Sequence, residues 1–138
     1  MNVTKDMIKA GLRELGLKEG DVVLVHSSLS SMGWVEGGPD TVVDALLEVV
    51  GAEGTVAVPT SPFRGYMYDY VKTTPIFDVR NTPSQLGAVT EALRLRPNAV
   101  RSLEATHSVA AIGPRAKFLT KDHEKSITPC GRDTPYGR

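Results

Sequence analysis

Apolar residues recur along the first part of the chain with the spacing of a helix and then of a strand. Four apolar positions between Met7 and Leu15 share one helical face, and Thr4 and Gly16 stand where an N-cap and a helix end belong. The run Val22–Val25 is continuously apolar and mostly β-branched, which is typical of a strand buried on both faces. We therefore expect a helix followed by the first strand of a sheet.

The clearest helix in the sequence begins near Pro39 and ends at Gly51. Proline suits the first helical position, an acidic residue follows in the first turn, and apolar positions from Val42 to Val50 form one stripe. The apolar run Thr55–Val58 then provides a second strand. A strand, a helix and a strand in this order predict a βαβ unit with parallel strands and a right-handed crossover.

The segment from Thr60 to Thr82 has no period and is rich in aromatic residues, prolines and polar residues. Its aromatic content argues against disorder. We interpret it as an ordered loop that either walls a pocket or covers an edge of the sheet. The sequence Thr82–Gln85 (TPSQ) has the residues of a helix start, so a helix is expected from there to about Leu95.

The remaining elements are shorter. Ser108–Ile112 is a third apolar strand, Arg115–Lys121 is a short helix, and the tail from Thr128 to Arg138 is expected to be loop without a docked terminal element. The pattern predicts one α/β domain over residues 1–138, with a parallel or mixed sheet and flanking helices.

Composition and charge limit the partners and the cellular location that we expect for this protein. The chain of 138 residues has 16 basic and 16 acidic side chains and a formal net charge of zero, which predicts neither a nucleic-acid nor an anionic-membrane partner. Its single cysteine, Cys130, excludes an internal disulfide and reads as an incidental thiol. The N-terminus lacks a signal peptide, and no apolar run approaches the roughly 20 residues of a membrane span. We expect a soluble, cytoplasmic protein.

The connection His26–Thr41 joins the first strand to the clearest helix, and it concentrates serines, glycines and one tryptophan. The start of a helix offers unpaired N–H groups and the positive end of the helix dipole, so anions bind there readily. The pattern is neither the dinucleotide fingerprint nor a P-loop. Its histidine, His26, either contacts a ligand at the carboxyl end of the strand or bonds a neighbouring loop.

Two residues before the third strand are candidates for acid–base chemistry. Glu104 and His107 are close enough in sequence to orient each other, although both could instead be solvated loop residues. The three histidines stand far apart, so no metal site is expected. A serine-hydrolase elbow is also missing.

Three blocks of the sequence resemble the aminoglycoside 3-N-acetyltransferase family. The blocks are VLVHSSLSSMGWVEGGPDTVVDAL from Val23 to Leu46, FDVRNTPSQLGAVTEALR from Phe77 to Arg94, and RSLEATHSVAAIGPRA from Arg101 to Ala116, with PCGRDTPYGR at the end. They follow the family order across nearly the whole chain. The resemblance implies transfer of an acetyl group from acetyl-CoA to the 3-amino group of a 2-deoxystreptamine aminoglycoside, and thus a role in antibiotic resistance.

The same resemblance implies roles for individual residues. One group would contact the pantetheine or phosphates of acetyl-CoA; its members are His26, Ser27, Ser28, Leu29, Ser30, Gly33, Trp34, Val35, Ser108, Val109 and Ala110. A second group would face the polycationic sugar; its members are Tyr66, Asp69 and Asp78. Glu104 and His107 are the catalytic candidates within this chain.

Two departures from the family pattern qualify these roles. Family members commonly have His-Pro where this chain has Glu104 and Ala105. They are also about twice as long, and the resemblance places their catalytic histidine beyond Arg138. The chain therefore resembles the N-terminal half of such an enzyme, with little catalysis expected from it alone. Alternatives are a non-catalytic CoA-binding remnant, half of a split protein, or an acetyltransferase for another amine. An unpaired apolar sheet edge would favour self-association into a homo-oligomer.

Overall fold

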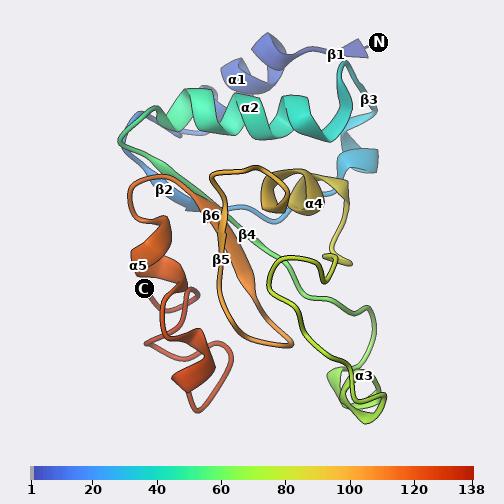
Figure 1. The fold of residues 1–138 in the computed structure, drawn as a ribbon. Helices are drawn as coiled ribbons and strands as arrows, with labels where there is room; N and C mark the ends of the chain where they lie inside the picture. Colours follow the sequence, from blue (N-terminus) through green and yellow to red (C-terminus); the bar gives the residue numbers. More distant parts are fainter. Residues whose placement is uncertain (1) are drawn as a thin grey trace.

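The computed structural model describes residues 2–138 and forms three layers, with a mixed sheet between two sets of helices (Figure 1). The strands are β1 (Asn2–Val3), β2 (Val22–Leu24), β3 (Trp34–Val35), β4 (Thr55–Pro59), β5 (Val100–Arg101) and β6 (Val109–Ile112). The α-helices are α1 (Lys5–Glu14), α2 (Gly38–Val50), α3 (Met67–Lys72), α4 (Ala88–Arg94) and α5 (Ala116–Thr120), and the short 3-10 helices are η1 (Leu29–Met32) and η2 (His123–Lys125).

The main sheet has four strands in the order β2-β4-β6-β5, and β1 pairs separately with β3. Strands β2 and β4 are parallel and are joined through α2, which confirms the predicted βαβ unit. Strand β6 runs antiparallel to both β4 and β5, so the sheet is mixed. The predicted fold class is therefore confirmed, and the third predicted strand corresponds to β6.

The larger core lies between the sheet and α2, α4 and α1. Val43, Val50 and Leu93 from the helices are completely or almost completely buried there against Val56 and Val58 of β4. A smaller apolar cluster on the opposite face packs α5 against the sheet. Both faces of the central strands are thus covered, which explains why all five residues of β4 are buried.

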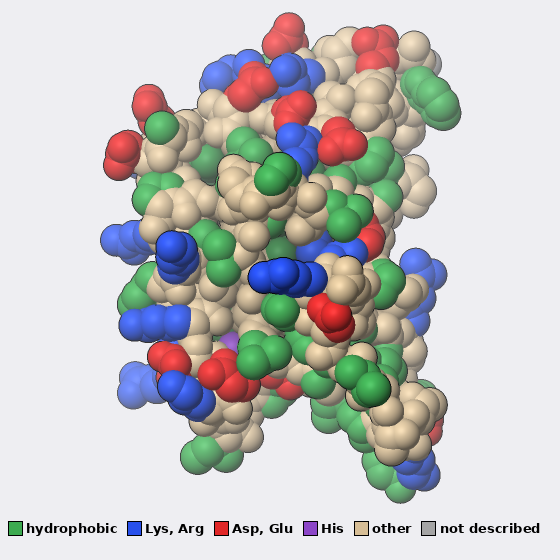
Figure 2. Space-filling view, in the orientation of Figure 1, with side chains coloured by type: hydrophobic (Ala, Val, Ile, Leu, Met, Phe, Trp, Pro, Cys, Tyr) green, Lys and Arg blue, Asp and Glu red, His purple; other side chains and the backbone are tan. Residues whose placement is uncertain are grey.

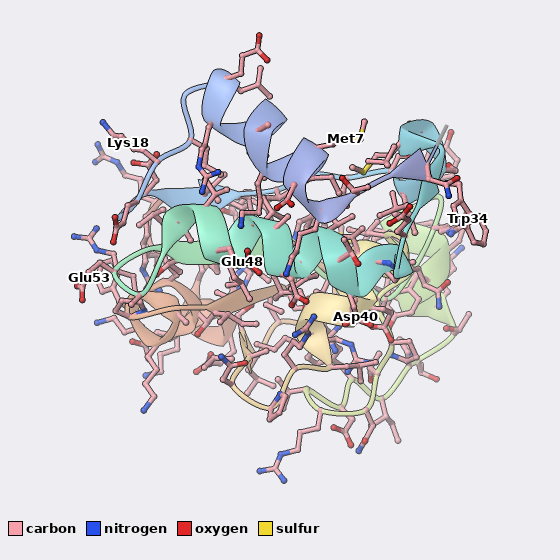
Figure 3. All side chains as sticks on the ribbon, turned by 90° about the horizontal axis from the view of Figure 1, so that it is seen from above. Met7, Lys18, Trp34, Asp40, Glu48 and Glu53 are labelled. Carbon is pink, nitrogen blue, oxygen red and sulfur yellow. The ribbon has the colours of Figure 1, made fainter. Side chains whose placement is uncertain are left out.

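Local signals position the first two helices. The hydroxyl of Thr4 accepts a hydrogen bond from the backbone N–H of Met7, as expected of an N-cap. In α2, Pro39 lies in the first turn, and the backbone N–H of Gly51 bonds to the carbonyl oxygen of Leu47 at the end. Seen from above, α1 runs obliquely beside α2, and Glu48 of α2 forms salt bridges with Lys5 and Lys9 of α1 (Figure 3).

Three expectations were wrong. Strand β2 is an edge strand and not buried on both faces, because Val22 is 44% and Leu24 38% exposed. The segment 60–82 is not free of regular structure, because it contains α3. This helix projects from the body of the molecule (Figure 1). A run of apolar residues cannot by itself distinguish an edge strand from a central one.

The third error concerns the start of α4. Thr82 does not cap this helix, because its hydroxyl accepts from the backbone N–H of Asp78 and closes the preceding turn. Ser84 forms a second turn by accepting from the backbone N–H of Leu86. Gly87, with a φ of 112°, then redirects the chain so that the helix begins only at Ala88.

The tail is loop without a helix or strand, as predicted, and side-chain hydrogen bonds attach its end to the body of the protein. The guanidinium of Arg138 donates to the carbonyl oxygens of Phe118, Leu119 and Lys121 at distances of 3.1, 3.1 and 2.5 Å. These carbonyls lie at the end of α5, where backbone carbonyl oxygens have no intrahelical N–H to accept from. None of the helices among residues 2–138 is long and apolar enough to span a bilayer.

Candidate functional site

The connection after β2 lines a groove of about 670 Å³, which we call the serine groove. One wall comes from this connection and the other from the loop and turn before α4. The lining residues are Ser27, Ser28, Leu29, Ser30, Gly33, Arg64, Gln85, Leu86, Gly87 and Ala88. Two segments about 55 positions apart in the chain thus form one surface, and its volume lies within the range of small-molecule sites.

Backbone conformation keeps the serine groove open at two glycines. Gly33 has a φ of 79° and Gly87 a φ of 112°, and a Cβ atom built on either residue would meet nothing within 4 Å. Side chains rarely adopt such φ angles, so glycine is required by the backbone and leaves space in front of it. A ligand could therefore approach the main chain closely at both positions.

The serine hydroxyls of the groove form a small network. Ser31 donates to Ser28 at 2.9 Å, and the hydroxyls of Ser28 and Ser30 are 3.2 Å apart. Three hydroxyl groups contain three protons, and the two hydrogen bonds use only two of them. One hydroxyl proton at Ser28 or Ser30 is therefore free to donate to a ligand.

Not every residue assigned to the donor by sequence lies in this groove. His26 is exposed and lines a separate hollow of about 460 Å³ beside α1. Trp34 is 73% exposed at the rim of the molecule, whereas Val35 is 5% exposed and belongs to the core (Figure 3). The predicted cluster is thus divided among different surfaces.

The other predicted donor segment, Ser108–Ala110, is fully buried in the sheet. Its residues are bonded on both sides, because Val109 pairs with Pro59 of β4 and Ala110 with Arg101 of β5. No backbone edge of this segment is left for a ligand to bind as an added strand. A role for it beside pantetheine remains only a prediction from the resemblance.

Glu104 and His107 are linked indirectly. The carboxylate of Glu104 accepts from the backbone N–H groups of Thr106 and His107 and from the Thr106 hydroxyl. The Thr106 hydroxyl lies 2.9 Å from Nδ1 of His107. Since its one proton is donated to the carboxylate, Nδ1 must donate to the threonine, which leaves Nε2 as the acceptor nitrogen of the neutral ring. The carboxylate therefore organises the loop and fixes the histidine tautomer.

The imidazole of His107 lies beside the segment 60–82, which we call the aromatic loop. Its ring meets Phe63 edge to face at 6.2 Å, and Phe63 stacks on Tyr70 of α3 at 4.9 Å. Burial raises the pKa of the Tyr70 hydroxyl. Part of the aromatic loop is thus packed against the body of the protein, as an ordered loop requires.

The predicted acceptor residues lie on the outer side of this loop. Tyr66 is 81% exposed at the start of α3, and Asp69 is exposed on the helix. Asp78 is exposed, but its carboxylate accepts from the side chain and backbone N–H of Asn81 and from the backbone N–H of Arg80. These bonds lower the pKa of Asp78, the one from the Asn81 side chain most, so the carboxylate is stabilised in its charged form.

Arg101 fastens the aromatic loop to the sheet. Its guanidinium donates to the carbonyl oxygen of Thr60 at 2.7 Å and to that of Thr82 at 2.5 Å, and it lies 4.8 Å from the ring of Phe77. Burial lowers the pKa of Arg101 to about 10, which still leaves the side chain charged at neutral pH. Its bonds hold the first and last residues of the loop.

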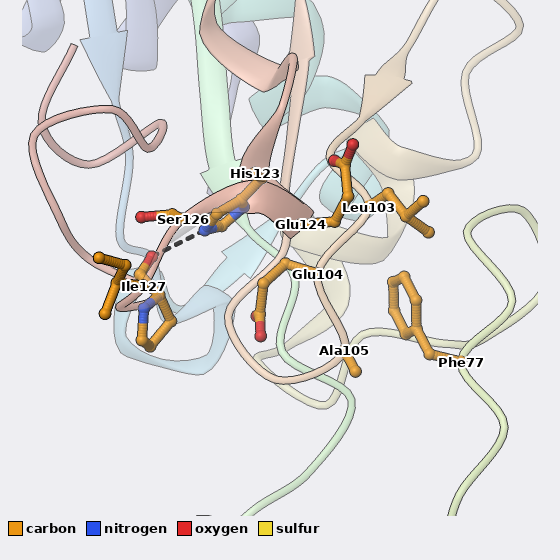
Figure 4. A pocket seen from close by; sticks show the side chains of 9 residues that line it. Phe77, Leu103, Glu104, Ala105, His123, Glu124, Ser126 and Ile127 are labelled. Carbon is orange, nitrogen blue, oxygen red and sulfur yellow. Dashed lines mark hydrogen bonds between the residues drawn. The ribbon is translucent and has the colours of Figure 1, made fainter.

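A second hollow, of about 400 Å³, lies between the loop before β6 and the chain after α5 (Figure 4). It contains His123, which is buried and bonded at both nitrogens. Nε2 donates to the carbonyl oxygen of Pro129 at 2.7 Å, and Nδ1 accepts from the hydroxyl of Ser102 at 2.8 Å. His123 therefore holds the tail in place and has no free nitrogen for a ligand.

Positive and negative side chains both occur on the face of the molecule shown in Figure 2, and neither sign covers it. This agrees with the balanced composition. Among residues 2–138, no group of three or more His, Cys, Asp or Glu side chains is arranged to hold a metal ion.

Sequence reasoning missed half of the serine groove. Arg64 lies in a loop without periodicity, and Gln85–Ala88 were assigned to the interior of a helix. The one available signal was Gly87, a residue that weakens a helix interior and fits a turn.

The fold and the groove define an α/β protein with a site between two loops, and comparison with known proteins identifies its family. The model of the family described as aminoglycoside 3-N-acetyltransferase matches residues 24–138. The chain therefore belongs to this family. It is 38% identical to aminoglycoside N(3)-acetyltransferase IX of Micromonospora chalcea over 149 residues, an alignment that covers 99% of the chain and 53% of the relative. The chain spans about half the length of the curated relatives it matches.

Solved structures show the same relation. Aminoglycoside acetyltransferase AAC(3)-Xa superposes with a TM-score of 0.89 at 39% identity, covering 99% of this chain and 52% of that one. AAC-IIIb in a binary complex with CoASH gives a TM-score of 0.84 at 28% identity, covering 99% and 55%. AAC-VIa bound to sisomicin gives 0.83 at 33% identity, covering 98% and 55%.

Proposed function

We propose that this chain binds acetyl-CoA in the serine groove and provides the donor site of an aminoglycoside 3-N-acetyltransferase. The observation that supports this most is the groove itself, because it joins free hydroxyl protons, open glycines and one cation in one surface. A related acetyltransferase of the same fold has been solved with CoASH. The reaction would form a C–N bond to the amine and break the thioester C–S bond.

The chemistry of the groove fits the donor. Leu29, Leu86 and Ala88 offer apolar contacts for the carbon chain of pantetheine, whereas Ser27 and Gln85 offer polar groups for its amides. Sites for small molecules commonly combine an apolar lining with a few placed polar groups. Ser27, Ser30 and Gly33 complete the wall on the side of η1. Of the donor residues expected from sequence, we retain these five for direct contact: Ser27, Ser28, Leu29, Ser30 and Gly33.

We further propose that the amine substrate binds along the aromatic loop. Tyr66 and Asp69 are exposed there, and Asp78 is stabilised as an anion. A polycationic sugar is attracted by carboxylates and can stack its apolar faces on tyrosine rings. A related enzyme, AAC-VIa, has been solved with sisomicin bound.

His107 is the candidate proton acceptor in this chain, since Nε2 carries its lone pair in the neutral ring. Glu104 acts through the loop, because its oxygens are occupied by Thr106 and by the backbone N–H of His107. The resemblance places the principal catalytic histidine of the family outside these residues. We therefore propose that full activity requires the part of the relatives that this chain does not match.

A second candidate function is a non-catalytic CoA-binding unit, or one half of a protein made of two chains. It is favoured by the site itself, because the serine groove suits CoA while the carboxylate of Glu104, one of the two acid–base candidates here, is occupied by hydrogen bonds within its own loop. The open edge at β2, with its exposed Val22 and Leu24, would suit either a complementing chain or self-association into a homo-oligomer. Under either function, we also propose that the protein is cytoplasmic and that these residues form a single domain, which corresponds to the N-terminal portion of the relatives.

Two measurements test these proposals. Calorimetric titration with CoA tests the donor site, and absence of binding at low salt would exclude both functions. Thiol release from acetyl-CoA with sisomicin as acceptor then separates them, provided that it is measured on a full-length protein that contains these residues: turnover supports the transferase, and binding without turnover supports the non-catalytic unit. A panel of other amines as acceptors tests the substrate class, because turnover with those amines but not with sisomicin would reject the aminoglycoside.

A further inference from the structure

Arg64 is the only charged residue among those that line the serine groove. Within residues 2–138 it forms no salt bridge, whereas Arg94 and Arg96 are paired with carboxylates. A single unpaired cation in a groove of neutral residues gives that surface a local positive charge. Such a surface favours an anionic ligand over a cationic one.

The side chain of Arg64 is exposed, but a hydrogen bond to the protein orients it. Its Nε donates to the carbonyl oxygen of Gln85 at 2.9 Å, and the backbone N–H of Gln85 donates to the carbonyl oxygen of Ser61 at 2.8 Å. The planar guanidinium therefore has one N–H anchored while its two terminal nitrogens have no partner among the described residues. Those nitrogens carry four further donors in a fixed plane.

The opposite wall supplies a second kind of donor. The network of Ser28, Ser30 and Ser31 leaves one hydroxyl proton unused, as counted above. Arginine and serine donors on facing walls suit an oxygen-rich anion, and phosphate accepts from a guanidinium through two parallel bonds. A carboxylate has only two acceptor oxygens, whereas a terminal phosphate has three and a diphosphate diester has four non-bridging oxygens, enough for donors on both walls.

We propose that Arg64 is a phosphate-binding residue, which receives a phosphate of CoA together with the hydroxyl of Ser28 or Ser30. This inference rests on the proposed donor site and deepens it, because it assigns the charged and hydroxyl donors of the serine groove to a phosphate and the apolar side chains of Leu29 and Leu86 to pantetheine. The relevant anion is either the 3′-phosphate or the pyrophosphate of CoA.

Calorimetric titration of the 138-residue chain with CoA, 3′-dephospho-CoA and pantetheine tests the proposal. In Arg64→Gln we expect CoA to bind about 10-fold to 100-fold more weakly, the cost of one charged hydrogen-bonded contact. The salt dependence of CoA binding should also decrease. Pantetheine, which has no phosphate, should bind the variant as it binds the unaltered chain. Arg64→Lys keeps the charge but not the anchored fork, so an intermediate affinity is expected.

Arg132→Gln is the matched control, since it removes the same charge at an exposed position that does not line the serine groove. Far-UV circular dichroism and thermal midpoints establish that each variant is folded. If Arg64→Gln and Arg132→Gln bind CoA equally, Arg64 is not the phosphate ligand, although the donor site stands. If Arg64→Gln weakens pantetheine as much as CoA, the effect is structural and the inference is again wrong.

The ligand series identifies the phosphate. If 3′-dephospho-CoA is insensitive to Arg64→Gln while CoA is sensitive, Arg64 binds the 3′-phosphate. If both are equally sensitive, it binds the pyrophosphate. If the unaltered chain binds none of the three ligands, the proposed donor site fails and the inference fails with it.

Discussion

Removal of the Arg101 guanidinium should release the aromatic loop from the sheet. Arg101→Met deletes the bonds to the carbonyl oxygens of Thr60 and Thr82, which are the first and last residues of the loop. It also deletes longer bonds from Nε to the hydroxyls of Thr60 and Ser108, both 3.1 Å. Methionine fills much of the same volume, so the change tests the hydrogen bonds more than the packing.

The expected loss in the free energy of unfolding follows from the two short hydrogen bonds of Arg101. Each hydrogen bond from a charged donor contributes about 1.5–3 kcal/mol, and the variant regains part of this because no cation is buried. We expect a net loss of about 3 kcal/mol in the free energy of unfolding, out of the roughly 5–15 kcal/mol typical of a domain. Arg101→Lys should lose about 1–2 kcal/mol, since one ammonium cannot reach both carbonyls.

Urea unfolding followed by far-UV circular dichroism measures the loss, and native-state hydrogen exchange locates it. Exchange should accelerate within residues 60–82 more than in α2. Arg115→Met is the control, because Arg115 is exposed and its side chain forms no hydrogen bond among the described residues; a change within about 0.5 kcal/mol is expected there. An Arg101→Met variant as stable as this control would refute the assignment of Arg101 as the anchor of the loop.

Three further predictions concern other parts of the molecule. The bonds from two lysines of α1 lower the pKa of Glu48 to about 2. The contribution of Glu48 to the free energy of unfolding is therefore fully present above the ordinary pKa near 4.5 and is lost as the pH falls through about 2. Glu48→Gln should reduce this pH dependence in urea unfolding, and an unchanged acid profile would contradict the ion network. Gly113→Ala should lower the thermal midpoint by roughly 5 °C or more, because a Cβ atom there would overlap the carbonyl oxygen of Gly54 and the residue has a φ of 133°. A midpoint equal to that of the unaltered chain would count against this geometry. Nitrogen-15 NMR should detect the proton of neutral His107 on Nδ1 and a loss of this preference in Thr106→Val, whereas a ring protonated on Nε2 in the unaltered chain would disprove the deduced tautomer.

The sequence predicted the elements whose signals are local. Pro39 and Gly51 bound an amphipathic stripe, so α2 was predicted almost to the residue. The βαβ unit followed from order alone. The antiparallel course of β6 and the pairing of β1 with β3 depend on contacts between distant segments, and strands of two residues have too few positions to show a period.

The candidate site was predictable only on one side. Ser27–Ser30 and Gly33 form a recognisable connection between a strand and a helix, and the structure brings them together. Arg64 carries no signal of its own, because an arginine in an aperiodic loop is usually solvated. The role of Ser108–Ala110 beside a ligand stays a prediction from the resemblance, and their burial at the central strand β6 could not be read from the apolar run alone.

The central claim is that CoA binds in the serine groove, and chemical-shift mapping by ¹H–¹⁵N NMR during titration with CoA tests it most directly. The account predicts saturable shifts concentrated at Ser27–Gly33, Arg64 and Gln85–Ala88, with pantetheine shifting the subset near Leu29 and Leu86. Shifts concentrated in the second hollow, the one lined by Glu104 and His123, would contradict it. The absence of shifts at millimolar CoA would contradict it as well.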